Sequence, residues 1–113
     1  MSDTKTLYAE GEKLKDQGDF AGAAEKFQAV LQEKPDHVLA HLALAVTYGN
    51  LGQFAESVEH AEKACELEPT DSFNFTALSV TYQKAYEGTR DPIYIEKAES
   101  AKARSDMGQG GLH

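Results

Sequence analysis

Apolar and small residues recur along most of this chain at intervals of three and four, the spacing that gathers them on one face of a helix. The first two stretches show the pattern at Leu7, Gly11, Leu14, Ala23, Phe27, Val30 and Leu31. The alternation of apolar and polar residues that marks a half-buried strand is missing. The pattern predicts six helices, over residues 4–17, 20–33, 38–50, 54–67, 72–87 and 91–106.

Helix-breaking residues separate these stretches. Gly18 and Gly52 fall between consecutive helices, where a residue that tolerates positive φ ends one helix before the next begins. Pro35 and Pro69 follow the second and fourth helices, which proline cannot continue. Candidate helix starts carry an N-cap residue or a proline suited to the first turn, at Asp36, Asp71, Asp91 and Pro92.

The chain repeats itself at a period of 34 residues. Residues 43–48 read Ala-Leu-Ala-Val-Thr-Tyr, and residues 77–82 read Ala-Leu-Ser-Val-Thr-Tyr. The same spacing joins the first third to the second, since Gly18, Phe20, Ala21, Glu25 and Pro35 recur as Gly52, Phe54, Ala55, Glu59 and Pro69. A fixed period of this length is typical of stacked helical repeats.

These repeats resemble the tetratricopeptide repeat family. The matching small, aromatic, glycine and proline positions are Gly11, Gly18, Ala23, Phe27 and Pro35, then Ala45, Tyr48, Gly52, Ala64 and Pro69, then Phe75, Leu78, Ser79 and Tyr82. The resemblance implies an all-α fold, a right-handed α-solenoid of three antiparallel helix pairs. We expect one domain over residues 1–106, with repeats at about 4–37, 38–71 and 72–106. Residues 107–113 carry three glycines, and we expect a flexible C-terminal tail there.

The third repeat is longer than the other two. Ser57 follows Tyr48 by nine positions, whereas the matching Ala98 follows Tyr82 by sixteen. Seven added residues are close to two helical turns, so both helices of the pair can lengthen by about one turn each and keep their packing faces in phase. The sequence favours this extended hairpin, with its turn at residues 88–90, and leaves a seven-residue loop as the alternative.

Composition narrows the classes of partner. The 113 residues include 11 Lys and Arg against 19 Asp and Glu, a formal net charge of −8. A negative protein is repelled by nucleic acid and by anionic membranes, so we expect neither as a partner. The first residues are polar, and no run of 18 apolar residues occurs, which leads us to expect a cytoplasmic protein.

Candidate chemistry is sparse. The pattern offers no nucleophile beside a base and no phosphate loop, so we expect no catalytic residues and no cofactor, and an enzyme with an unrecognised site remains an alternative. His37 and His41 have the spacing of a metal pair, but no neighbouring ligand completes a site, so we expect no metal. The single cysteine, Cys65, lies among packing residues and is expected to be buried. An acidic face at Glu59, Glu62 and Glu66 is interpreted as solvated surface, with a docking ridge for a basic partner as the alternative.

The predicted helix 38–50 is apolar almost all the way round, so it must be covered on several sides. In the family it resembles, the first helix of each repeat lines a concave groove. The resemblance places the following residues in that groove: Tyr8, Glu12, Leu39, Leu42, Val46, Phe73, Thr76 and Val80. We therefore expect a noncatalytic adaptor or scaffold that binds an apolar helix or extended segment of a protein partner. The alternatives are burial of these side chains inside the array, and a self-assembling scaffold whose groove or end binds further copies.

Some family members clamp the acidic C-terminus of a chaperone with Lys, Arg and Asn side chains. The five corresponding positions in this chain are occupied by Tyr8, Glu12, Ala43, Phe73 and Ala77. None of these residues is basic or carries an amide, so we expect that this chain is not a carboxylate clamp.

Overall fold

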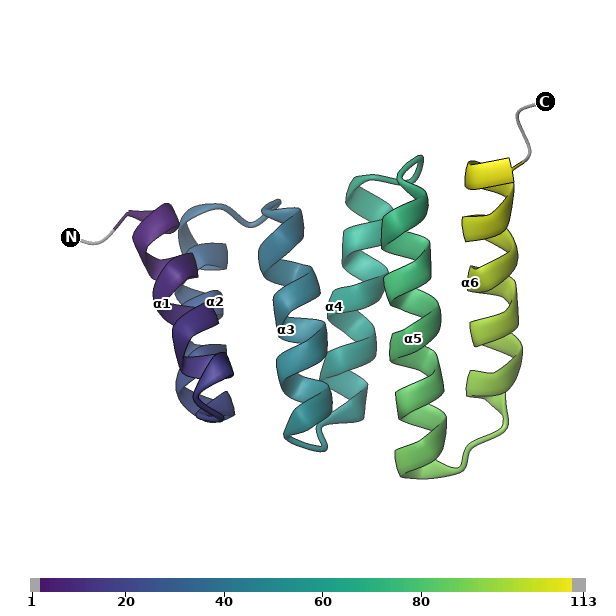
Figure 1. Cartoon of the computed structure of the whole chain (residues 1–113), viewed down its shortest axis with the longest axis horizontal. Helices are drawn as coiled ribbons and strands as arrows, with labels where there is room; N and C mark the ends of the chain where they lie inside the picture. Colours follow the sequence, from purple (N-terminus) through teal and green to yellow (C-terminus); the bar gives the residue numbers. More distant parts are fainter. Residues whose placement is uncertain (1–2, 111–113) are drawn as a thin grey trace.

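The computed structural model describes residues 3–110 and consists there of six helices joined by short turns (Figure 1). Their bounds are α1 Thr4–Asp16, α2 Phe20–Glu33, α3 Val38–Asn50, α4 Phe54–Leu67, α5 Ser72–Thr89 and α6 Ile93–Gly110. Consecutive helices pack side by side in three antiparallel pairs, and α3 also contacts α5. The predicted all-α solenoid is confirmed.

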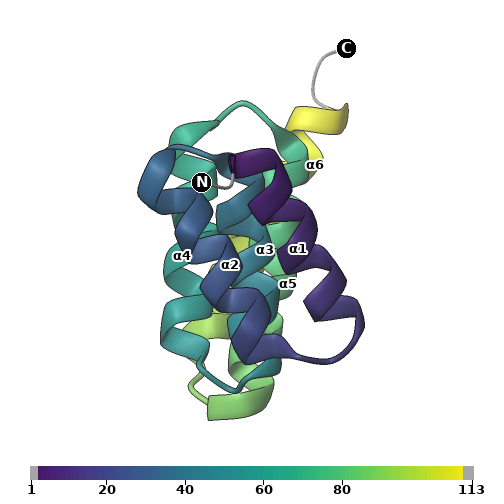
Figure 2. The same cartoon turned by 90° about the vertical axis from the view of Figure 1, so that its left-hand side faces the viewer.

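The helices form two layers. Seen from the end, α1, α3 and α5 lie on one side of the molecule, and α2 and α4 lie on the other (Figure 2). Gly18 and Gly52 have the positive φ expected of them, 85° and 78°, and each follows the first helix of its pair. Asp71 caps α5, since its Oδ1 accepts the Phe73 N–H at 2.9 Å. The cap expected from Asp36 is supplied by His37 instead, whose Nδ1 accepts the Ala40 N–H at 3.1 Å.

The third pair is an extended hairpin rather than a helix pair joined by a long loop. However, the turn lies later than the sequence indicated, because α5 runs through Gly88 to Thr89 and α6 begins at Ile93. The left-handed residue that ends α5 is Arg90, at φ 61°, and its N–H donates to the Tyr86 carbonyl at 2.6 Å. Gly88 serves a different purpose, because a Cβ there would collide with the Phe54 ring at the start of α4. Because Gly88 has no side chain, the last turn of α5 can pack against Phe54 of the preceding helix pair.

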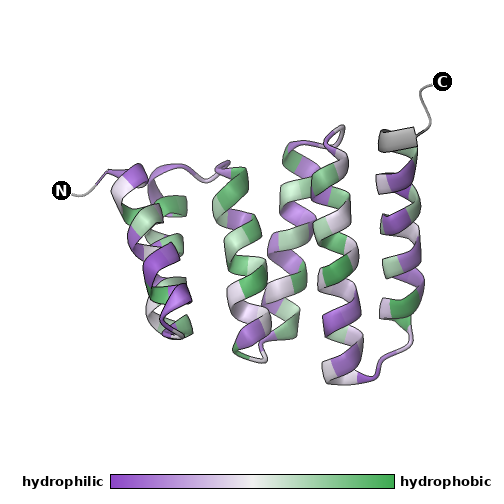
Figure 3. Cartoon of the chain, viewed as in Figure 1, coloured by the Kyte–Doolittle hydropathy of each residue, from purple (hydrophilic) through white to green (hydrophobic). Residues whose placement is uncertain are grey.

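The last helix is also longer than expected. It continues to Gly110, so residues 107–110, which were expected in the tail, are helical, and residues 111–113 lie outside the described part of the chain. Its inward face holds Tyr94, Ala98, Ala101 and Ser105 against α5, where Ser79 donates to the Ala98 carbonyl at 3.0 Å. Hydrophilic positions alternate with apolar ones along this helix (Figure 3).

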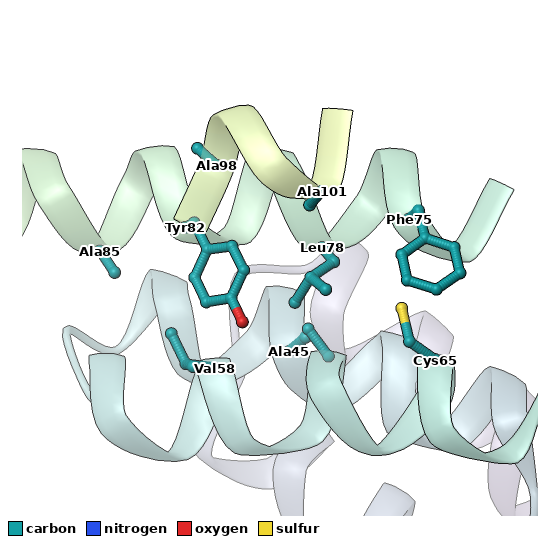
Figure 4. Packing of buried hydrophobic residues seen from close by; sticks show 10 residues of the cluster. Ala45, Val58, Cys65, Phe75, Leu78, Tyr82, Ala85, Ala98 and Ala101 are labelled. Carbon is teal, nitrogen blue, oxygen red and sulfur yellow. The ribbon is translucent and has the colours of Figure 1, made fainter. Parts of the chain in front are cut away.

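The buried residues fall into clusters that meet at α3. One cluster joins α3 to α4, α5 and α6 through Ala45, Val58, Ala61, Cys65, Phe75, Leu78, Tyr82, Ala85, Ala98 and Ala101 (Figure 4). The others join the first pair to α3 through Leu7, Ala23, Ala24, Phe27, Val30, Ala40, Ala43 and Leu44. Because α3 serves clusters on two sides, it carries buried side chains on more than one face.

Candidate functional site

The predicted groove residues on α3 and α5 are exposed. Leu39 is 55% exposed, Val46 49%, Phe73 62% and Val80 46%. Leu42 lies among them and is partly buried. These five side chains are called the apolar stripe below. The interpretation in which they are buried inside the array is wrong for the four exposed members, because the packing faces of α3 and α5 are occupied by other residues, such as Leu44 and Leu78.

Three stripe residues line one open cavity. It lies between the N-terminal halves of α3 and α5, has a volume of about 320 Å³, and is lined by Leu39, Leu42 and Phe73 together with Asp36, His37, Val38, Glu68, Asp71 and Asn74. Asn74 is almost fully buried at its wall, and its Nδ2 donates to the Glu68 carbonyl at 3.3 Å. This bond fixes the end of α4 against the first turn of α5.

The other predicted groove residues are engaged within the fold. Tyr8 is half-buried, packs on the Phe27 ring at 5.4 Å and stacks on His37 at 5.7 Å between centroids. Glu12 pairs with Lys15, with 3.2 Å between Oε1 and Nζ. The Thr76 hydroxyl lies 2.5 Å from the Ser105 Oγ of α6. The structure therefore brings the apolar stripe together on α3 and α5. Tyr8, Glu12 and Thr76 have partners within the chain, and Thr76 is exposed as well.

A histidine pair between α3 and α4 was not anticipated from the sequence. The Nδ1 atoms of His41 and His60 lie 3.0 Å apart, and His41 Nε2 lies 2.8 Å from the Pro35 carbonyl oxygen. A carbonyl only accepts hydrogen bonds, so His41 carries its proton on Nε2, and in the neutral pair His60 donates from Nδ1. His60 also stacks on Tyr48, at 5.7 Å between ring centroids. His60 follows His41 by 19 positions along the chain, so no local motif reveals this pair.

The three histidines of residues 3–110 have hydrogen-bond partners within the fold. His37 caps a helix, and His41 and His60 bond to each other. Among residues 3–110, no group of three His, Cys, Asp or Glu side chains is placed to hold a metal ion. Cys65 is buried as expected, and its sulfur points toward the Phe75 ring (Figure 4). Desolvation raises the pKa of this thiol to about 11, which keeps it protonated at neutral pH.

The histidine pair makes the stability of the protein dependent on pH. Desolvation, together with the neighbouring His41, lowers the pKa of His60 from 6.5 to about 4, and Glu56 acts in the opposite direction. As pH falls from 6.5 toward 4, His60 binds a proton in the unfolded chain but not in the folded chain. The free energy of unfolding therefore decreases through this range. Because the ring retains contact with solvent, we expect a loss on the order of 1 kcal/mol.

Urea unfolding at pH 7.5, 6.5, 5.5 and 4.5 measures this loss. Carboxylates begin to titrate at the lower end of the range, so His60→Gln is the matched control, and the difference between the two pH profiles isolates the histidine. A His60→Gln profile as steep as that of the unsubstituted chain would contradict the assignment.

Within residues 3–110, no helix combines the length and the apolar character that crossing a membrane requires.

Comparison with known proteins identifies the repeat. A family model described as tetratricopeptide repeat matches residues 14–73. The crystal structure of the Sgt2 TPR domain from Aspergillus fumigatus superposes with a TM-score of 0.66 at 18% sequence identity, covering 97% of this chain and 83% of that one. That likeness shows the fold, and the family match covers more than half of the sequence, so this chain belongs to the tetratricopeptide repeat family.

Proposed function

We propose that this chain is a noncatalytic protein-interaction module that binds a segment of a protein partner on the apolar stripe of α3 and α5. Tetratricopeptide repeat domains generally mediate protein–protein interaction. The observation that carries the proposal is the exposure of Leu39, Val46, Phe73 and Val80 along two neighbouring helices. A group of neighbouring exposed apolar side chains marks an interaction site more often than a single exposed apolar residue does. Contact of the group with water is unfavourable, and burial against a partner removes this cost.

The chain is not expected to act as a carboxylate clamp. The positions that would hold an acidic C-terminus are occupied by Tyr8, Glu12, Ala43, Phe73 and Ala77. In this structure Glu12 places a carboxylate on α1, and Phe73 presents an aromatic ring to solvent. That the chain is not a carboxylate clamp and that it is cytoplasmic both stay predictions.

A self-assembling scaffold is the second candidate. The observation in its favour is the set of large apolar side chains that α6 exposes at the end of the solenoid: Ile93, Ile95 and Met107. Stacking of solenoid ends joins two different surfaces and can produce open chains as readily as dimers. Sedimentation over a hundredfold concentration range separates the candidates, because a protein that stays monomeric throughout rules out the scaffold.

The interaction surface can be tested with two matched substitutions. Phe73 and Met107 are almost equally exposed, at 62% and 66%, but only Phe73 belongs to the apolar stripe. Peptides selected from a random library on the unsubstituted chain should bind Phe73→Ser about tenfold more weakly, because the exposed aromatic anchor of the stripe is lost. They should bind Met107→Ser within about twofold of the unsubstituted chain. Fluorescence polarisation with labelled peptides gives both affinities, and equal binding by the two variants would refute the stripe as the site.

A further inference from the structure

The charge around the cavity between α3 and α5 indicates which kind of segment fits it. Its apolar wall is formed by Leu39, Leu42 and Phe73, and its rim carries three carboxylates, those of Asp36, Glu68 and Asp71. No Lys or Arg lines this cavity. The one imidazole, that of His37, accepts the Ala40 N–H at its Nδ1 as a helix cap.

Helix capping explains only part of this rim. Asp71 caps α5, and Asp36 directly precedes the N-terminal turn of α3, where the helix dipole favours a negative charge. Glu68 lies at the opposite end of a helix, as the C-cap of α4, where the dipole disfavours a carboxylate. Within residues 3–110, none of the three carboxylates has a cationic group within 4.0 Å. None of the three carboxylates therefore forms an ion pair within the described part of the chain.

Resting on the proposed function, we infer that the stripe binds a peptide segment whose apolar side chains are followed closely by a Lys or Arg. The apolar side chains cover Leu39, Leu42 and Phe73, and the cation lies beside Glu68 and Asp36 at the rim. An acidic segment in the same place would bring carboxylates against three like charges while the apolar contact removes water. The charge of the rim thus selects against the acidic C-termini that the clamp of this family takes.

A second hollow beside α5 gives no comparable selection. It lies in the extended hairpin, where Glu87 and Glu99 line it together with Arg90. Because charges of both signs are present, this hollow favours neither an acidic nor a basic segment. Two further hollows carry charges of one sign, Glu25 and Glu33 in one and Lys97 and Arg104 in the other, but neither is lined by a residue of the apolar stripe. The cavity between α3 and α5 combines stripe residues with carboxylates.

A random dodecapeptide library selected on the full chain tests the inference. We expect the enriched peptides to place Lys or Arg beside apolar residues more often than the unselected library does. A double variant, Asp36→Asn with Glu68→Gln, removes two rim charges and should weaken these peptides about fivefold. Neither side chain takes part in a hydrogen bond within the described residues, and Asp71 is left in place because it caps α5.

A second double variant separates the rim from the general negative charge of the protein. Glu25→Gln with Glu59→Gln makes the same change in net charge on the exposed surface of α2 and α4, and should change the affinity by less than about twofold. Equal weakening by both double variants, or enriched peptides without a basic excess, overturns the inference. If such peptides bind the unsubstituted chain but not Val46→Glu, the stripe remains the binding site and only the preference for a basic segment is rejected. Peptides that bind Val46→Glu as well as they bind the unsubstituted chain, or a library without any enrichment, overturn both the stripe as the binding site and the preference for a basic segment.

Discussion

Gly11→Ala should destabilise this protein by about 1–2 kcal/mol, whereas Gly49→Ala should stabilise it by a few tenths to about 1 kcal/mol. Both glycines are helical, and alanine has the higher helix propensity at such positions. A Cβ on Gly11 would lie 2.6 Å from Cε1 of Phe27, but a Cβ on Gly49 meets only Ser57 Oγ at 3.5 Å. The two substitutions are chemically identical, so the difference between them isolates the contact with Phe27.

The Phe27 ring has nowhere to move. It is completely buried and belongs to a cluster with Ala23, Ala43 and Leu44, and the Tyr8 ring packs against it at an interplanar angle of 54°. Relief of the collision would require α1 to move away from α2, so the overpacking outweighs the gain in helix propensity. Urea unfolding of the two variants at pH 7.5 measures both effects. A Gly11→Ala variant as stable as Gly49→Ala would show that the first helix pair is packed more loosely than the structure indicates.

Val46→Glu should leave the helices intact and abolish binding at the stripe. Val46 is 49% exposed, so in the free protein a carboxylate at this position remains in contact with water. In the complex it would be covered by apolar partner atoms without a counter-charge, which costs several kcal/mol and corresponds to about a hundredfold loss of affinity or more. The cation expected at the cavity rim cannot rescue it, because Val46 lies seven residues, about 10 Å, along α3 from Leu39.

Val30→Glu is the matched control for this substitution. Val30 is completely buried between the first helix pair and α3, so the same change places an unpaired charge in the core and should unfold the protein. Circular dichroism distinguishes the two variants directly. Loss of helicity in Val46→Glu would show that the stripe is covered in solution, and a folded Val46→Glu that binds the selected peptides normally would exclude the stripe as the site.

The 34-residue period and the apolar spacing were sufficient to predict the helices and their order. Four of the six predicted ranges agree with the structure to within one residue, because glycine, proline and the amphipathic pattern act locally. The errors in the predicted helix bounds occur where a tertiary contact determines the end of the helix. Gly88 is conformationally suited to a turn, yet it lies within α5 because the Phe54 ring occupies the space next to it, and Arg90 takes the left-handed conformation instead.

The candidate site was less predictable than the fold. Repeat position grouped Thr76 with Val80, and both are exposed, but it gave no sign that Ser105 of the extended α6 meets the Thr76 hydroxyl. Position along the chain also gave no sign of the contact between His41 and His60, since they belong to different helices. The acidic rim of the cavity depends on the way the α2–α3 and α4–α5 turns converge in space, which the sequence pattern does not specify.

The position of α3 between the buried clusters has a consequence for cooperativity. In the described residues, the clusters of the first pair and the larger cluster of the last four helices meet only at this helix, and no cluster spans both sides without it. In a nearest-neighbour description of the array, α3 therefore carries most of the coupling free energy between the two halves. Detachment of α1 and α2 would expose one side of α3 to water and leave its contacts with α4 and α5 in place. The first pair is thus the natural unit of partial unfolding, and amide exchange in α1 and α2 reports on that opening separately from global unfolding.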